Sequence, residues 1–227
     1  MTKILFVTGT GTDVGKTFVS ALILKKLHEN NIDAGYYKAA VSGNERINGK
    51  LIPGDPAFVK NLSGIHQPLD SMVSYIYEEA VSPHLAGKLE GNPVELTTVL
   101  EDYKKVAASY DYVTLEGSGG IACPLRYDEK SELWLEDVVK EINTPVVIVA
   151  KAGLGTINDL VLTVHYLKSK DISIAGIIFN HFHEDSVMER DNLKMVEKRT
   201  GIKVIACVHE GDTDLNISLS DLIELYK

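Results

Sequence analysis

Short apolar runs alternate along the whole chain with longer segments in which apolar residues recur every three or four positions. The short runs are typical of buried strands and predict strands at 3–8, 33–38, 111–116, 145–150, 174–180 and 203–208. The longer segments predict helices at 17–30, 95–110, 133–143, 156–170, 186–201 and 218–227. This alternation predicts an α/β fold of βαβ units, with a mostly parallel sheet and helices on both of its faces.

No linker, repeat or low-complexity stretch divides the 227 residues, so we expect a single domain spanning 1–227. The least regular part is 40–95, which is rich in glycine, proline, asparagine and serine. A long irregular insertion in an α/β domain is usually functional. Ligands of such folds bind beyond the carboxyl ends of the strands, so the residues that follow each predicted strand are the first candidates for a site.

The formal net charge of −9 argues against a nucleic-acid surface, and a polyphosphate site in this chain needs local positive groups. The N-terminus lacks a signal-peptide pattern, and the apolar runs are too short to span a membrane. The two cysteines, Cys123 and Cys207, lie far apart in no metal-type spacing, which is typical of reduced thiols. We therefore expect a cytoplasmic protein with neither nucleic acid nor membrane as a partner.

The clearest candidate chemistry lies in the stretch GTGTDVGKT, which follows the first predicted strand and opens the first predicted helix. A phosphate-binding loop needs glycines whose backbone N–H groups reach phosphate oxygens, a lysine for the β and γ phosphates, and a hydroxyl for Mg²⁺. Gly15, Lys16 and Thr17 provide these groups in the expected context. Five residues separate Gly9 from Gly15, and three separate Gly11 from Gly15, where the usual pattern has four. The alternative is a glycine-rich turn with a chance Gly-Lys-Thr.

Charged residues also stand at two other predicted strand ends. Lys38 is either a solvated strand-end lysine or a fixed cation over an anionic reacting group. Glu116, followed by Gly-Ser-Gly-Gly, is placed like the acidic residue that holds Mg²⁺ in phosphate-loop enzymes. Asp55 lies in PGDP, where it is either an ordinary turn residue or a metal ligand. Because Mg²⁺ prefers oxygen ligands, Thr17, Asp55 and Glu116 together with nucleotide oxygens could form its coordination shell.

The loop GTGTDVGKT resembles that of dethiobiotin synthetases, whereas Gly11 stands where partition-type ATPases carry a second lysine. Five further stretches resemble that family in order along the chain: YYKAAVSG at 36–43, GDPAF at 54–58, AVSPHLAGKLEG at 80–91, LEGSGGIACPL at 115–125 and GLGTIND at 153–159. Asn180 ends a predicted strand as the family's adenine-contacting asparagine does. The resemblance covers residues 1–180 and weakens beyond 200, where the family's proline near His209 is absent.

The resemblance implies an ATP-dependent cyclo-ligase of biotin biosynthesis, which makes dethiobiotin from 7,8-diaminononanoate, CO₂ or bicarbonate, and MgATP. One amine of the diamine takes up CO₂ to give a carbamate, and the carbamate oxygen attacks the γ-phosphate to give a carbamic–phosphoric anhydride. The second amine then closes the ring, and ADP and phosphate are released. The resemblance also implies a homodimer, in which a turn of the second subunit holds the carboxylate of the diamine.

The resemblance further implies roles for individual residues, with catalysis by Lys16, Lys38 and Thr12. The residues implied to bind ATP and its metal are Asp13, Val14, Gly15, Lys16, Thr17, Asp55, Glu116, Gly117, Ser118, Gly119, Asn180, His209, Glu210 and Gly211. The residues implied to bind the diamine are Thr12, Lys38, Ser42, Leu154, Gly155, Thr156, Ile157 and Asn158. Thr17, Asp55 and Glu116 are the implied ligands of Mg²⁺.

The residues taken alone leave a second function open, a non-catalytic ATP-driven dimerising switch of the partition-ATPase type. In a switch, Lys38, Ser42 and the turn 154–158 have no substrate to hold. Thr156 is then an ordinary helix cap and not part of a carboxylate site. The two functions differ in whether ATP hydrolysis depends on the diamine and bicarbonate.

Overall fold

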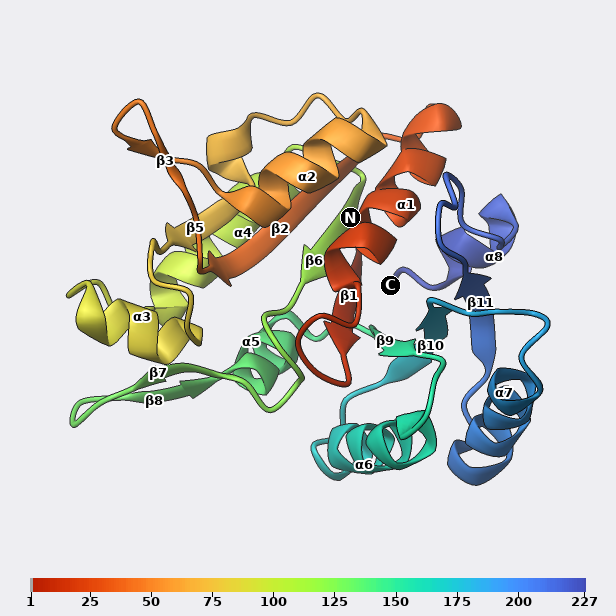
Figure 1. Cartoon of the computed structure of the whole chain (residues 1–227). Coiled ribbons are helices and arrows are strands. Elements are labelled where there is room, and N and C mark those ends of the chain that lie inside the picture. Colours follow the sequence, from red (N-terminus) through yellow and green to blue (C-terminus); the bar gives the residue numbers. More distant parts are fainter. Residues whose placement is uncertain (1) are drawn as a thin grey trace.

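One sheet of seven parallel strands forms the centre of the computed structural model, which describes residues 2–227 (Figure 1). Its strands are β1 (Lys3–Gly9), β2 (Ala34–Val41), β5 (Val73–Ile76), β6 (Tyr112–Glu116), β9 (Val146–Lys151), β10 (Ile174–Asn180) and β11 (Val204–Val208). Across the sheet their order is β11–β10–β9–β1–β6–β2–β5. The predicted parallel α/β architecture is therefore confirmed.

Helices cover both faces of this sheet. They are α1 (Lys16–Glu29), α2 (Gly54–Ser63), α3 (Pro83–Leu89), α4 (Leu96–Ala107), α5 (Leu135–Ile142), α6 (Thr156–Ser169), α7 (Val187–Thr200) and α8 (Leu219–Glu224). Successive strand residues point to opposite faces, so Leu5 and Val7 lie in one buried cluster while Phe6 lies in the other. The first cluster packs under α1, α2 and α8, and the second packs under α3 to α7.

The differences from the predicted elements lie mainly in the irregular part, 40–95. The edge strand β5 has only four residues, too few for its alternation to stand out. Asp55 lies in the first helical turn of α2 and not in a loop turn as expected. Pro56 is tolerated there, because N–H groups at a helix start lack intrahelical partners. Residues 133–134 belong to a strand and not to the predicted helix. That strand is β8 (Glu132–Trp134), which forms a short hairpin with β7 (Pro124–Tyr127). A second short hairpin consists of β3 (Arg46–Ile47) and β4 (Lys50–Leu51).

The order of the strands places the candidate residues at one edge of the sheet. Strand β6 lies between β1 and β2, and its last residue, Glu116, is in register with Val7 on one side and Lys38 on the other. The loop that follows β1 therefore faces the carboxyl ends of β2 and β6, where ligands bind in such sheets. Among residues 2–227, no helix combines the length and apolar character that a membrane crossing requires.

Candidate nucleotide and metal site

The loop between β1 and α1 has the backbone shape of an anion site. Its last residue, Gly15, adopts a left-handed conformation with φ 94° and caps α1, whose first N–H groups are free to bind a ligand. The side chain of Asn180, at the end of β10, donates a hydrogen bond of 3.0 Å to the carbonyl of Val14. A Cβ atom on Gly15 would lie 1.9 Å from Nδ2 of Asn180. Glycine is therefore required here both by the backbone angle and by the space.

Lys16 begins α1 and is 7% exposed. Its Nζ donates a hydrogen bond of 2.9 Å to the carbonyl of Gly11 in the same loop. Burial, and after it the nearby charge of Lys38, lowers the pKa of Lys16. A neutral carbonyl compensates a buried ammonium only in part, so an anion in the loop would be a better partner.

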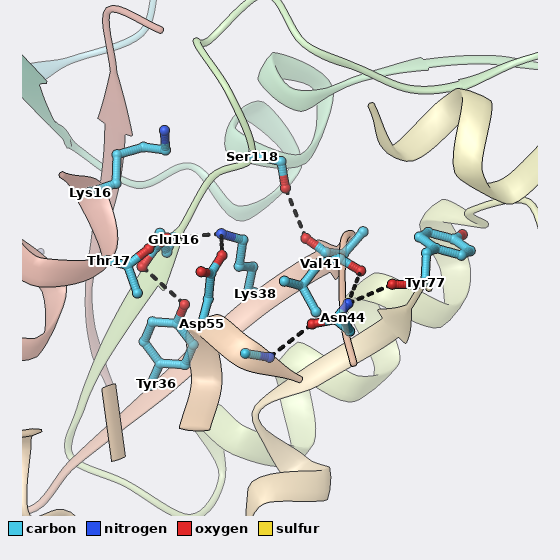
Figure 2. A network of polar contacts seen from close by, with 12 residues as sticks. Lys16, Thr17, Tyr36, Lys38, Val41, Asn44, Asp55, Tyr77, Glu116 and Ser118 are labelled. Atoms are coloured by element: carbon cyan, nitrogen blue, oxygen red, sulfur yellow. Dashed lines mark hydrogen bonds and ion pairs between the residues drawn. The ribbon is translucent and has the colours of Figure 1, made fainter. Parts of the chain in front are cut away.

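A second lysine lies at the centre of a charged network (Figure 2). Nζ of Lys38 lies 2.6 Å from Oδ2 of Asp55 and 2.8 Å from Oε1 of Glu116. The same Oε1 accepts a hydrogen bond of 2.8 Å from the hydroxyl of Thr17. Burial disfavours the ammonium, but Glu116 and then Asp55 outweigh burial and raise the pKa of Lys38.

Four elements bring these side chains together. The register of β2 with β6 sets Lys38 directly opposite Glu116. Thr17 is the second residue of α1, and Asp55 is the second residue of α2. The network thus joins residues that are far apart in the sequence; Thr17 and Glu116, for example, are separated by 99 positions.

Asn44 fixes the start of α2, which carries Asp55. Its Oδ1 accepts a hydrogen bond of 2.8 Å from the backbone N–H of Gly54, and its Nδ2 donates to the carbonyls of Val41 and Tyr77 at 3.0 and 2.7 Å (Figure 2). Asn44 is 5% exposed. The sequence reasoning missed Asn44, because an asparagine beside a glycine is an ordinary loop signal.

Tyr36 is a second residue that sequence reasoning missed. Its hydroxyl donates a hydrogen bond of 3.0 Å to Oε2 of Glu116 (Figure 2). Burial, followed by the charges of Glu116 and Asp55, raises the pKa of Tyr36, so the hydroxyl keeps its proton and acts as a donor. Its place in the apolar run AGYYKAAV indicates only a core residue.

Eleven of the 22 predicted site residues line one cavity of about 310 Å³. Its lining consists of Thr12, Asp13, Gly15, Lys16, Thr17, Lys38, Val41, Ser42, Asp55, Glu116, Ser118 and Gly119. Of these, only Val41 was not predicted. Val14, Gly117 and Asn180 lie beside the lining, and Ser118 ties the glycine loop to β2 by donating a hydrogen bond of 2.8 Å to the carbonyl of Ala40.

The donor atoms around Lys38 fit Mg²⁺. They are oxygens only, one hydroxyl and two carboxylates, and the carboxylates of Asp55 and Glu116 already converge on a single cation, the Lys38 ammonium. Within residues 2–227, no three His, Cys, Asp or Glu side chains gather as a metal cluster. Two carboxylates and a hydroxyl suit an ion that keeps several waters and takes further oxygens from a bound nucleotide.

The turn before α6 lies apart from this lining. Its Leu154 is 93% exposed, and Gly155, with φ 95°, caps α6. Thr156 is therefore not the helix cap, because the left-handed Gly155 takes that position. The hydroxyl oxygen of Thr156 is buried and has no hydrogen-bond partner among the described residues. Ile157 and Asn158 follow in the first turn of α6.

His209, Glu210 and Gly211 follow β11 at the same edge of the sheet. Asn180 of β10 is in register with Val208, so the end of β11 and the loop residue His209 lie next to Asn180. The ring of His209 contacts Phe182 edge-on, and its Nδ1 lies 3.1 Å from Oδ2 of Asp212. Glu210 and Gly211 are exposed, and these three residues lie outside the cavity described above.

Comparisons with known proteins identify the family. A family model described as an AAA domain matches residues 3–213. The ATP-dependent dethiobiotin synthetase BioD of Brachyspira hyodysenteriae is 46% identical over 211 residues, which cover 93% of this chain and 94% of that protein. The protein of the same name from Clostridium botulinum is 44% identical over 227 residues, which cover 100% of this chain and 99% of that protein. The chain belongs to the dethiobiotin synthetase family.

Solved structures outside this family share the fold at low identity. A ParA family ATPase from Chlorobium tepidum matches with a TM-score of 0.56 and 16% identity, over 93% of this chain and 86% of that chain. The cell division protein FtsY from Thermotoga maritima matches with a TM-score of 0.54 and 15% identity, over 99% of this chain and 68% of that chain. They show the fold alone. The full-length relatives have a much higher identity, and they show membership of the dethiobiotin synthetase family and not of the partition-type switches.

We expect Gly15→Ala to weaken ATP binding by on the order of tenfold or more. A left-handed backbone costs a non-glycine residue about 1–3 kcal/mol, and the added Cβ would also displace Asn180. Calorimetry of ATP binding measures the loss. Gly11→Ala is the matched control, because a Cβ on Gly11 meets open space in the same loop. Equal ATP affinity of the two variants would contradict the assigned role of Gly15.

Proposed function

We propose that this chain joins CO₂ to 7,8-diaminononanoate and closes the ring to dethiobiotin, with ATP as co-substrate and with ADP and phosphate as products. One observation carries the proposal: a single cavity is lined by the phosphate loop, by Lys38 and by the oxygen donors Thr17, Asp55 and Glu116. Phosphoryl transfer needs little beyond positioning and charge neutralisation, and this set supplies both.

Lys16 and Lys38 would reduce the electrostatic repulsion between the two anionic reactants. Two anions, a carbamate and a triphosphate, must approach each other in line. Unit charges about 4 Å apart repel by about 4 kcal/mol at an effective dielectric constant of 20. Lys16 at the start of α1 and Lys38 in β2 line the same cavity and would offset this repulsion, with Thr12 on the loop before α1.

We propose that Thr17, Asp55 and Glu116 hold Mg²⁺ together with oxygens of the nucleotide. An ion held there would supply positive charge that offsets the negative charge of the phosphates. Lys38 both contacts two of these donors and lines the cavity, so its ammonium would be available to the reacting groups next to the metal donors. Ser42, on the loop after β2, lines the same cavity and would orient the diamine next to Lys38.

The remaining residues are proposed to contact the nucleotide on the basis of their positions in the fold. The backbone of Asp13 to Gly15 and the glycine loop at 117–119 would contact the phosphates, with the free N–H groups of α1. Asn180 and the loop of His209, Glu210 and Gly211 lie at the ends of adjacent strands, where they would contact the base.

We further propose that the chain works as a homodimer with a shared site. Leu154 is almost fully exposed, and α6 and α7, which pack side by side (Figure 1), also expose Leu162, Val187 and Met188. Exposed apolar groups gathered on one pair of helices are typical of a protein interface. The turn 154–158, which lies apart from the cavity in its own chain, would then hold the carboxylate of the diamine in the partner.

Two remaining assignments are also proposals. We propose a single domain, because both buried clusters pack on the same sheet. We propose a cytoplasmic location, because Cys123 and Cys207 are free thiols, and burial raises the pKa of each to about 11.

The function is tested by measuring ADP release with and without the diamine and bicarbonate. A dethiobiotin synthetase needs both, and the product is identified by mass spectrometry. ATP hydrolysis that is indifferent to both compounds would contradict the proposal and favour the switch.

We expect Lys38→Leu to lower kcat by about 10²-fold or more, the scale on which the loss of one preorganised charge-stabilising donor is felt. The reason is that Lys38 would contact the carbamate and the transferred phosphoryl group more than the resting nucleotide. ATP affinity by calorimetry should change by less than about tenfold, because ground-state binding is largely retained. Lys16→Met is the comparison variant and should lose ATP affinity itself. If ATP binding collapses in Lys38→Leu while turnover at saturation is normal, Lys38 is a nucleotide clamp.

We expect Leu154→Asp to shift the protein from dimer to monomer and to raise the KM for the diamine, because a charge would be buried in an apolar contact. Sedimentation velocity and steady-state kinetics measure the two effects. Leu89→Asp is the control, since Leu89 is an exposed leucine on α3. A dimer with an unchanged KM in Leu154→Asp would argue against the shared site.

A further inference from the structure

The carboxylate of Glu116 is held through both of its oxygens, and Tyr36 contacts the one that faces away from the metal donors. Oε1 contacts Thr17 and Lys38, whereas Oε2 accepts the hydrogen bond from the hydroxyl of Tyr36. With both oxygens engaged, the carboxylate has one orientation. In it, Oε1 is directed toward the other proposed metal ligands (Figure 2).

The backbone of Tyr36 is itself fixed by a side chain. Gln67, which is 1% exposed, accepts a hydrogen bond of 2.7 Å from the N–H of Tyr36 and donates one of 2.9 Å to its carbonyl. Strand β5 pairs with β2 only from Lys38 onward. The amide of Gln67 therefore replaces a neighbouring strand at Tyr36, a position where β2 has none on that side.

The ring of Tyr36 has little freedom either. It is fully buried and belongs to the cluster under α1 that also contains Val7 and Val19. A ring packed in this way, on a backbone held by Gln67, presents its hydroxyl at a fixed point.

We infer that Tyr36 is a positioning residue, which holds Glu116 so that Oε1 is presented to the metal ion. This inference rests on the proposed Mg²⁺ site of Thr17, Asp55 and Glu116. Ligating carboxylates in metal sites are commonly hydrogen-bonded by a second residue, and loss of such a partner typically costs about 10- to 100-fold in metal affinity or activity.

The chain offers a matched control in the next residue. Tyr37 is also buried in β2, but its side chain points to the opposite face of the sheet. Its hydroxyl hydrogen-bonds Ser74 at 2.6 Å and the carbonyl of Val99 at 2.9 Å, away from the cavity. Tyr37→Phe thus removes a buried hydroxyl from the same strand without touching Glu116.

The experiment is calorimetry of ATP binding with Mg²⁺ and with excess EDTA, on wild type and on Tyr36→Phe, Tyr37→Phe and Glu116→Gln. The ratio of the two affinities measures the coupling of metal and nucleotide. We expect Tyr36→Phe to keep the affinity measured in EDTA and to lower the ratio by about tenfold, toward the ratio of Glu116→Gln. Tyr37→Phe should keep the wild-type ratio.

The outcomes separate the inference from the function on which it rests. If Glu116→Gln lowers the ratio while Tyr36→Phe matches wild type, the inference about Tyr36 is overturned and the metal site stands. If Mg²⁺ has no effect on wild type, and Glu116→Gln changes nothing, the metal site itself fails.

A second measurement does not depend on any variant folding. In a crystal structure of the wild type with Mg²⁺ and a non-hydrolysable ATP analogue, the hydroxyl of Tyr36 should remain within hydrogen-bond distance of Oε2 of Glu116. A carboxylate that has turned away from Tyr36 to bind the metal would overturn the inference.

Discussion

The pairing of Lys38 with Glu116 across β2 and β6 is the interaction on which the rest of the site depends. Both side chains are almost fully buried, and neither charge can stay there without a partner. Removing one partner of a buried ion pair typically costs about 3–5 kcal/mol, so the pair constrains its surroundings as strongly as an apolar core does. Asp55 and Thr17 complete the set of partners, which couples the start of α1 and of α2 to the centre of the sheet.

The charged side chains that line the cavity give it no net attraction for a triphosphate. Two lysines and three carboxylates, those of Asp13, Asp55 and Glu116, line it, so their formal charges sum to −1, and the chain as a whole carries −9. In the proposed site, attraction for a triphosphate would come largely from the free N–H groups at the start of α1 and from Mg²⁺ held by the carboxylates. Such a site would favour the metal–nucleotide complex over the free nucleotide.

The sequence predicted those parts of the site that have local signals. The phosphate loop and the ends of β2 and β6 could be found because glycine spacing and apolar runs are local properties. Asp55 was placed in a turn because Gly54 and Pro56 are common turn residues, yet both are also accepted in the first turn of a helix. Tyr36 and Asn44 could not be found, because their partners are set by strand register and by the path of the 42–53 loop.

The two carboxylates that contact Lys38 are held in place by residues outside the cavity lining, Glu116 through a core side chain and Asp55 through the backbone of its helix. Tyr36 contacts Glu116 directly, and Asn44 fixes the helix start that carries Asp55. Groups held in this way need little reordering when a ligand arrives, and this lowers the entropy cost of binding. Lys16 differs, because its ammonium is hydrogen-bonded to one loop carbonyl, a neutral acceptor that a phosphate can replace. The carboxylate side of the cavity is thus preorganised by the core, whereas the ammonium of Lys16 on the loop side can exchange its partner when an anion binds.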